Sequence, residues 1–441
     1  MHKFKINVAI FLTLIFLFAI LNILIPKNEE AATSENRDVT SMPTFSIEKL
    51  LSGDFFKELD NYVADTFVFR EKFIAASGQI KDMYGVKGEE EVQIFSTNGV
   101  NVAQKIKVNK EIDNQTVSAS TTTRSAEDAD QQTEEDADEE LVQNQNFGQI
   151  LIVKNSAMEI NTFNEDASIK YAESINYIAQ QVDDSVNVYS LLVPTQIEFT
   201  TNKSIADVSY SQKESIAFVN RHYNNQVTPI NVYDNMMTHS NEYIYFRTDH
   251  HWTALGAYYA YEEFAKTIGD EAIPLSDFTK EKIPDFLGSL FKATLSPKLH
   301  ENPDTIEVYH PKTKHKYFVY KPAEVVKHNV IVSTFKKSNQ KYRLFMGGDF
   351  PLSIIKTEVH NGRKIVVIKD SYANAFAPYL LAHYEEIYIV DPRMFEGNLI
   401  SLIKENTIND VLFLNYVLVN RYDGYSKLFK EIATNEEKEY F

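Results

Sequence analysis

The chain has 441 residues, 44% of them hydrophobic and 12% aromatic, so it is long and apolar enough to bury a large core. Its formal net charge of -18 disfavours a nucleic-acid partner, because phosphate binding needs clustered lysine and arginine side chains. Cysteine is absent, which excludes disulfides, thiolate metal sites and a cysteine nucleophile.

Residues 1–26 predict a membrane anchor. Lys3 and Lys5 precede an almost unbroken apolar run over residues 6–26, and roughly 20 such residues span a bilayer. Positive charge before the run keeps the N-terminus in the cytoplasm and exports the rest. A cleaved signal peptide is the alternative, although Ile25-Pro26-Lys27 is a poor small-residue cleavage site. We therefore expect a single-pass protein of the cell membrane with an extracytoplasmic C-terminal domain.

Polar residues 27–45 predict a tether, and apolar residues at helical spacing then predict two helices between Ser46 and Ile80, with a break near residues 65–67. Residues 103–146 have low complexity. Within them, residues 127–140 hold nine acidic side chains and no basic one, so we expect a disordered acidic insertion.

From residue 149 onward, apolar strands alternate with helical patterns. Strands are predicted at 149–153, 186–193, 229–233, 364–369, 386–390 and 410–416, and helices at 167–182, 214–223, 253–266, 372–383 and 398–405. This alternation is typical of a doubly wound, mostly parallel α/β sheet with ligands at the carboxyl ends of its strands. Residues 278–343 break the pattern and predict a β-rich insertion, with strands at 316–320 and 330–334. One main domain over residues 46–441 would carry both insertions.

Ser371 closely follows a predicted strand and opens a predicted helix. Free N–H groups at a helix start favour negative charge, so an acyl carbon attacked by this hydroxyl would place its oxyanion among donors. Asn374, one turn along, offers another donor. Gly347 and Gly348 either let the backbone approach the substrate or form a plain turn. The alternative for Asp370-Ser371 is that they only cap the helix.

The segment Asp249-His250-His251-Trp252 supplies a carboxylate and two imidazoles at a helix entrance. In an extended chain Asp249 and His251 project to one side, so the carboxylate can reach the imidazole and fix its tautomer. His250 projects differently and could orient the loop or contact substrate; spacing does not settle which histidine is the base. With Ser371, these are the parts of a Ser-His-Asp site. The alternative is a capping aspartate beside structural histidines.

Thr248-Asp249-His250-His251-Trp252, followed by Lys369-Asp370-Ser371-Tyr372-Ala373-Asn374, resembles the bacterial DHHW protein family. That family is similar to the alginate O-acetyltransferase group of SGNH-hydrolase-like proteins, in which the Asp-x-His-Trp segment precedes the serine, as in a circular permutation of ordinary SGNH hydrolases. The resemblance covers about residues 46–420, because residues 65–70, 286–289, 346–351 and 391–393 also resemble family landmarks. It implies an SGNH-like fold with Ser371 as nucleophile, His251 as general base and Asp249 as its orienting carboxylate.

The resemblance further implies an O-acyltransferase, most simply an O-acetyltransferase, that acts on an exported or cell-surface polysaccharide. A membrane-bound O-acyltransferase would be the partner that delivers the acyl group. Candidates for oxyanion or substrate contacts are Asn374, Gly347, Gly348, His250, Trp252 and Arg393. For Arg393, an anionic sugar and a structural ion pair are equally open.

Three other functions stay open at this point. The same triad would make a carbohydrate esterase if water accepted the acyl group, and a non-catalytic polysaccharide-binding scaffold would need no triad at all. Asp249-His250-His251 is also similar to the Asp-His-His signature of manganese phosphoesterases, but such sites need further carboxylates from other strand ends. We therefore expect no cofactor.

Overall fold

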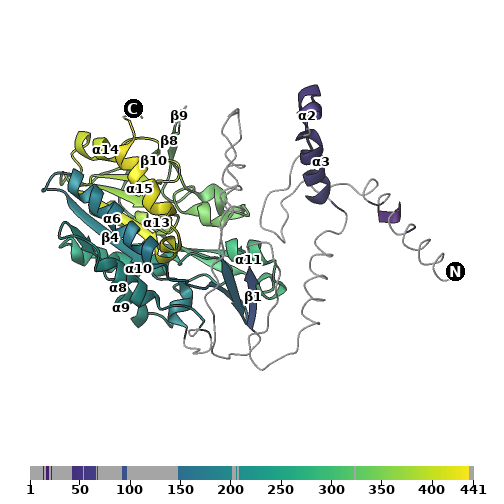
Figure 1. Cartoon of the computed structure of the whole chain (residues 1–441), viewed down its shortest axis with the longest axis horizontal. Helices are drawn as coiled ribbons and strands as arrows, with labels where there is room; N and C mark the ends of the chain where they lie inside the picture. The colour runs from purple at the N-terminus through teal and green to yellow at the C-terminus, as the bar shows by residue number, and fades with distance from the viewer. Residues whose placement is uncertain are drawn as a thin grey trace.

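The computed structural model of the chain is a mixed α/β fold built on one large sheet (Figure 1). It describes residues 148–200, 205, 208–321 and 324–436, together with 42–52, 54–65, 67, 92–96, 13, 16–18 and 21. Within those residues no helix has the length and apolar character needed to cross a bilayer. The predicted acidic insertion, and all but five residues of the predicted anchor, lie outside the described residues.

The central sheet has eight strands in the order β5-β4-β13-β11-β12-β10-β8-β9. Along that order the strands are β5 (Val227–Pro229), β4 (Asn187–Val193), β13 (Asp410–Tyr416), β11 (Lys364–Lys369), β12 (Glu386–Val390), β10 (Leu352–Thr357), β8 (His315–Lys321) and β9 (Glu324–His328). The first five strands run parallel, as the alternating pattern predicts. The last three join antiparallel. The sheet is therefore mixed, and β10 and β9 were not predicted from the sequence.

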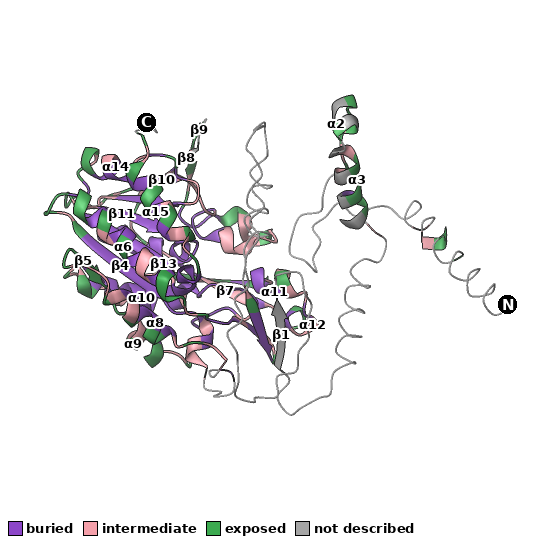
Figure 2. Cartoon of the chain, in the orientation of Figure 1, coloured by how far each residue is buried: buried purple, intermediate pink, exposed green. Residues whose placement is uncertain are grey.

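Helices cover both faces of this sheet. On β11, Val366 and Ile368 pack into one hydrophobic layer, and Ile365 and Val367 pack into the other. Because alternate residues of a strand face opposite sides, an apolar strand of this kind requires cover on both. One layer holds α6 (Glu165–Gln181), α8 (Gln212–Asn220), α14 (Leu399–Glu405) and α15 (Gly424–Thr434). The other holds α9 (Tyr233–Thr238) and α10 (Ala254–Thr267). Figure 2 shows the buried sheet between these helices.

Helix α10 begins where the sequence predicts. Thr253 caps it, accepting a hydrogen bond from Gly256 N at 3.2 Å. Gly256 allows close packing there, since a Cβ at this position would lie 2.4 Å from Ile244 O. The cap fixes the entry to α10 immediately after the Asp249–Trp252 segment.

Three sequence predictions are wrong in detail. The predicted strand 229–233 shares only Pro229 with β5, and Tyr233 already begins α9. The predicted helix 372–383 is a short α13 (Ala373–Phe376) followed by a 3-10 turn, Ala377–Ala382. Pro378 lacks the N–H that would continue the α-helix. The predicted strand 330–334 forms only an isolated bridge, Ile331 with Phe345, and residues Ser333–Lys337 form a 3-10 helix.

Smaller elements surround this sheet or lie earlier in the chain. β1 (Val92–Ser96), β2 (Gln149–Val153) and β3 (Ser156–Glu159) form a three-stranded sheet, and β6 (Thr279–Phe286) pairs with β7 (Asp304–His310). Short helices α11 (Ser289–Thr294) and α12 (Pro297–His300) join β6 to β7. Near the start, α2 (Ile47–Ser52) and α3 (Asp54–Asp65) lie where the first of the two helices is predicted, and the second predicted helix lies outside the described residues.

Candidate active site

The Asp249–Trp252 segment lies in a tight loop that a buried carboxylate holds in place. Tyr245 and Trp252 form a β-bridge at the base of the loop. Asp304 of β7, fully buried, accepts hydrogen bonds from Thr248 N at 2.8 Å and Thr248 Oγ1 at 2.7 Å. The residue before Asp249 is thus anchored through both backbone and side chain.

The loop brings the three residues predicted from the sequence, Asp249, His251 and Ser371, into one hydrogen-bonded relay. Nδ1 of His251 lies 2.5 Å from Asp249 Oδ1, and Nε2 lies 2.6 Å from Ser371 Oγ. The second contact joins residues 120 positions apart in the chain. All three side chains are buried, and Ser371 keeps 9% of its surface exposed. The geometry therefore lets a proton pass between Ser371 and an imidazole whose tautomer Asp249 fixes.

Asp249 sits in a cradle made by two residues that follow β6. Ser289 N donates to Asp249 Oδ2 at 2.8 Å, and a Cβ at Gly288 would lie only 2.2 Å from Asp249 Cβ. Burial by itself would raise the pKa of Asp249. The charge of His251 and the hydrogen bonds from His251 and Ser289 instead hold that pKa well below its usual range. The carboxylate therefore stays ionised beside the imidazole.

His250 and Trp252 tie the loop to the rest of the site. His250 Nδ1 contacts Ser289 Oγ at 2.6 Å, and Tyr372 OH donates to the His250 carbonyl. Burial, together with the nearby His251, lowers the pKa of His250 to about 3, so its ring is neutral. Trp252 Nε1 donates to Tyr372 O at 2.9 Å. Both residues thus join the mid-chain loop to the turn after β11.

The backbone donors expected at the helix after Ser371 are already used. Tyr372 N donates to Asp370 Oδ1 at 2.9 Å, Ala373 N to Asp370 O at 3.2 Å, and Asn374 N to Ser371 O at 3.2 Å. The prediction that free amides of this helix start would receive an oxyanion is therefore wrong for these three groups. The reason is that the chain makes an aspartate turn before a helix of only four residues.

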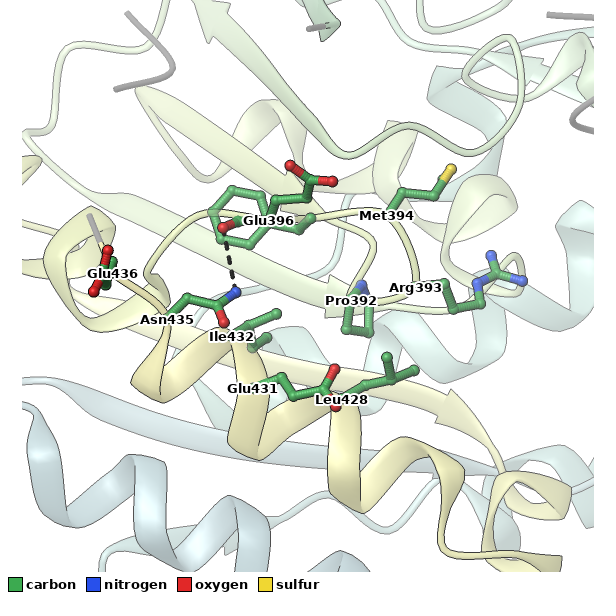
Figure 3. Close-up of a pocket in the computed structure, with 10 residues that line it drawn as sticks. Pro392, Arg393, Met394, Glu396, Leu428, Glu431, Ile432, Asn435 and Glu436 are labelled. Carbon is green, nitrogen blue, oxygen red and sulfur yellow. Dashed lines mark hydrogen bonds between the residues drawn. The ribbon is translucent and has the colours of Figure 1, made fainter. Parts of the chain in front are cut away.

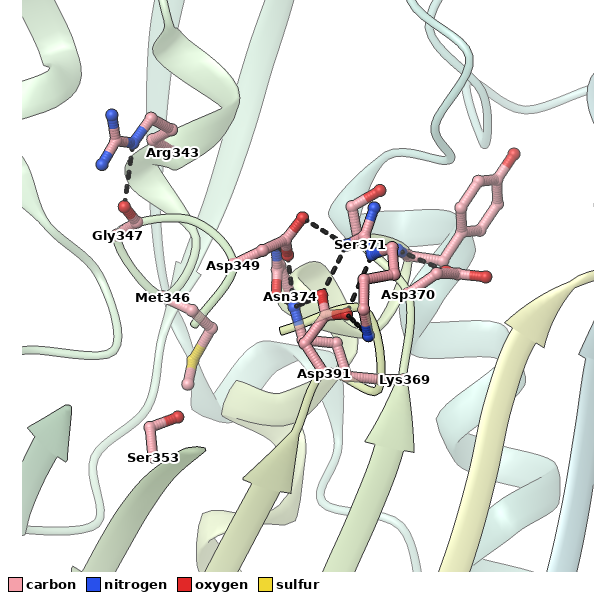
Figure 4. Close-up of polar contacts among 12 residues, drawn as sticks. Arg343, Met346, Gly347, Asp349, Ser353, Lys369, Asp370, Ser371, Asn374 and Asp391 are labelled. Carbon is pink, nitrogen blue, oxygen red and sulfur yellow. Dashed lines mark hydrogen bonds and ion pairs between the residues drawn. The ribbon is translucent and has the colours of Figure 1, made fainter. Parts of the chain in front are cut away.

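Asn374 and Arg393 belong to a buried charge network. Figure 4 labels its members Asn374, Asp349, Lys369 and Asp391. Asn374 Nδ2 donates to Asp349 Oδ1 at 2.8 Å, and Lys369 Nζ donates to Asn374 Oδ1 at 2.9 Å and also pairs with Asp349. Arg393 pairs with Asp349 Oδ2 at 2.8 Å and with Asp391. Burial alone would raise the pKa of Asp349, but these two cations hold it low. For Arg393 the structure thus shows the ion pair.

Arg393 also lines a cavity of about 390 Å³ between the turn after β12 and α15 (Figure 3).

Gly347 and Gly348 lie in the turn before β10, with φ of 83° and 121°. Gly347 N donates to Arg343 O at 3.1 Å, and Arg343 Nε donates to Gly347 O at 2.9 Å. The two glycines thus form the turn that delivers Asp349 to the network.

Several residues of the site were not assigned roles from the sequence. Tyr342 stacks on His251 with ring centroids 3.8 Å apart and planes at 9°, and its hydroxyl donates to Ser371 O at 3.1 Å. Ser289, Asp304 and Asp349 hold the loop and the strand end as described above. Gly288, Ser289 and Asp349 lie in segments that resemble family landmarks, and this resemblance is the sequence signal that could have identified them. Tyr342 and Asp304 lie in no such segment.

Asp249, His250 and His251 also offer ligand atoms that lie within 4.8 Å of one another. In the present arrangement, however, Asp249 Oδ1 and Oδ2 accept hydrogen bonds from His251 and Ser289, and His251 Nε2 faces Ser371. A metal ion there would compete with the relay for the same lone pairs.

Comparison with known proteins gives a family model and several solved structures. The model described as DHHW protein matches residues 35–146 and 106–390. A DHHW family protein from Eubacterium siraeum is 29% identical, with a TM-score of 0.60, over 66% of this chain and 96% of that one. Bacillus cereus PatB1 is 22% identical, with a TM-score of 0.54, over 64% and 99%. Among curated proteins no relative matches.

Proposed function

The chain belongs to the DHHW protein family, and from that premise we propose that it is an O-acyltransferase, most simply an O-acetyltransferase, acting on a polysaccharide hydroxyl. One observation carries the proposal: the buried relay in which His251 lies 2.5 Å from Asp249 and 2.6 Å from Ser371. A serine in hydrogen-bond contact with an oriented imidazole is the arrangement that activates a hydroxyl for attack on an acyl carbon.

The proposed reaction has two steps. First, Ser371 Oγ attacks the acyl carbon of the donor while His251 Nε2 takes the hydroxyl proton. The donor's leaving oxygen departs with that proton, and an acyl-enzyme forms on Ser371. Second, the acceptor hydroxyl gives its proton to His251 and attacks the acyl carbon, and Ser371 leaves as the alcohol with the proton returned. Asp249 stabilises the imidazolium in both steps.

Oxyanion donors must come from groups other than the three occupied backbone amides. Asn374 Nδ2 uses one hydrogen toward Asp349 and carries a second. We propose this second N–H as one donor to the developing charge, which in comparable sites lowers the barrier by about 3 kcal/mol.

We propose that the reaction takes place outside the cell, at the membrane surface. The support is the apolar run over residues 6–26, preceded by Lys3 and Lys5. Under this proposal the substrate is an exported or cell-surface polysaccharide. An acyl group activated in the cytoplasm must then cross the bilayer, and a membrane-bound O-acyltransferase is the partner that would deliver it.

The test uses the full chain in detergent, with p-nitrophenyl acetate as donor and neutral oligosaccharides as acceptors. Mass spectrometry should find an acetyl group on Ser371 and acetylated oligosaccharide, and both should disappear in Ser371→Ala. A structure of Bacillus cereus PatB1 carries a sulfonyl adduct, so a sulfonyl fluoride is a suitable serine probe here.

The other functions predict different results. An esterase would hydrolyse the ester promptly and give no acetylated oligosaccharide. A scaffold would show neither ester cleavage nor labelling of Ser371, with glycan binding intact in Ser371→Ala. Loss of activity on chelation, restored by Mn²⁺, would favour a metal-dependent hydrolase and contradict the relay.

A further inference from the structure

A second cavity lies at the base of the loop that carries Asp249 and His251. Its volume is about 180 Å³, and four of its lining residues, from Tyr243 to Arg247, directly precede Thr248 in the chain. Other lining residues are Met158 of β3 and Phe199 and Thr200, which follow β4. The space suits one small ring-sized unit, and neither the relay nor the Arg393 network contributes to it.

Aromatic rings form one wall of this cavity. Phe199 and Tyr245 stack with centroids 5.7 Å apart and planes at 25°, and Phe199 is only partly buried. Tyr243 at the rim keeps 37% of its surface exposed. Flat aromatic faces at a cavity mouth bind amphipathic rings, because one face of the guest is apolar and its edge is polar. A sugar ring, with C–H groups on its faces and hydroxyls around its edge, has this character.

The polar groups of the cavity favour a guest without negative charge. Arg247 Nε pairs at 3.0 Å with Asp304, whose carboxylate is fully buried, so the charge of the guanidinium is already balanced. Glu242 accepts hydrogen bonds from His239 Nδ1 at 2.7 Å and Tyr259 OH at 2.7 Å, and the His239 bond lowers the pKa of Glu242. The cavity therefore presents the Glu242 carboxylate, which is paired only with an imidazole and a phenol and would repel a uronic acid more than a neutral sugar.

Asp304 connects this cavity to the relay. Its Oδ1 accepts from Arg247, and its Oδ2 accepts from Thr248 N, the residue before Asp249. Any group that packs against Arg247 thus contacts a side chain held by the same carboxylate that fixes the catalytic loop.

We propose that this cavity is a subsite for one neutral sugar unit of the acceptor polysaccharide, an inference that rests on the proposed function. Under this proposal the unit seated against Phe199 and Arg247 belongs to the same polysaccharide chain as the unit whose hydroxyl reacts at Ser371. The subsite would thereby set which hydroxyls along the polymer are acylated.

Ser240→Tyr tests the proposal by filling the cavity from its rim. Ser240 is half-buried and lines the cavity, whereas Ser276 is exposed and lies in a separate 3-10 turn, Leu275–Asp277, so Ser276→Tyr is the matched control. Calorimetry should detect binding of a neutral oligosaccharide such as chitotetraose or maltotetraose to the full-length protein. We expect Kd to rise about tenfold in Ser240→Tyr and to stay at the wild-type value in Ser276→Tyr.

Acyl transfer from p-nitrophenyl acetate to the same oligosaccharide gives a second readout. In Ser240→Tyr the ratio of transfer to hydrolysis should fall about tenfold, as expected if the acceptor no longer binds. Wild-type affinity in Ser240→Tyr, no binding of any neutral oligosaccharide, or preference for oligogalacturonate would overturn the subsite. Absence of acetyl-Ser371 in the wild type would instead overturn the proposed function, so the two failures are distinguishable.

Discussion

Two buried aspartates stand next to the proposed reacting groups, and their surroundings differ in one respect. Asp249 faces the imidazole of His251. Burial alone would raise the pKa of this carboxyl group, but the interaction with His251 holds the pKa low. Asp370, beside Ser371 in the chain, accepts only uncharged N–H groups from Tyr372, Tyr416 and Asn415, and burial raises its pKa to about 6. The comparison teaches that a carboxylate serves the relay by direct contact with an imidazole that becomes a cation during the reaction, and that adjacency to the serine in sequence does not provide this contact.

The largest effect on turnover is expected from Asp249→Asn. The amide cannot stabilise an imidazolium at His251, so hydrolysis of p-nitrophenyl acetate should fall about 10³-fold to 10⁴-fold, as in other triads. Asp370→Asn is the matched control and should reduce turnover per folded molecule far less. Equal losses in the two variants would remove the distinction between the aspartates.

Gly288→Ala should reduce turnover about 100-fold by displacing Asp249. The new Cβ would lie 2.2 Å from Asp249 Cβ, so the loop must move. Gly424→Ala is the control, because a Cβ there has no atom within 4 Å. Ester hydrolysis and thermal melting should be measured together, so that a loss of folded protein is separated from a loss of rate. Full activity in Gly288→Ala would show that the cradle does not position the carboxylate.

Tyr342→Leu should lower turnover about tenfold, because the ring that stacks on His251 is worth about 1 kcal/mol in such pairs. Tyr342→Phe keeps the stack and loses only the hydroxyl bond to Ser371 O, so its loss should be smaller. If Phe were as harmful as Leu, the hydroxyl rather than the stacked ring would matter.

The smallest effect on turnover, but a clear effect on stability, is expected from titrating Asp370. Its pKa is raised from 3.8 to about 6 in the folded state, so its contribution to stability is complete below pH 3.8 and is lost as pH rises through about 6. Between pH 4 and pH 7 the wild type should therefore lose up to about 3 kcal/mol of unfolding free energy relative to Asp370→Asn. Urea denaturation at the two pH values measures this, and identical pH slopes would contradict it.

Four of the five parallel strands could be predicted because they are continuous apolar runs separated by helical patterns. The strand β5 was predicted too late in the chain, because the apolar Ile230 and Val232 continue its pattern up to the start of α9. β10 was missed, since Leu352–Thr357 follows a glycine turn and runs into polar residues with no helix before the next strand. The relay residues were predicted from Asp249-His250-His251-Trp252 and Ser371, although His251 was chosen over His250 by family resemblance. Tyr342 and Asp304 could not be assigned, because tertiary packing of the 278–343 region, rather than any local spacing, brings them to the loop.

Trp252 is the single tryptophan of the chain, fully buried, and its indole N–H is bonded across the site to Tyr372 O. Excitation at the red edge of the protein absorption band, where tyrosines do not absorb, therefore selects one fluorophore positioned where the mid-chain loop meets the serine turn. A red shift of its emission would indicate that the two segments have separated. Tryptophan fluorescence can therefore show, for each variant above, whether the site is still assembled.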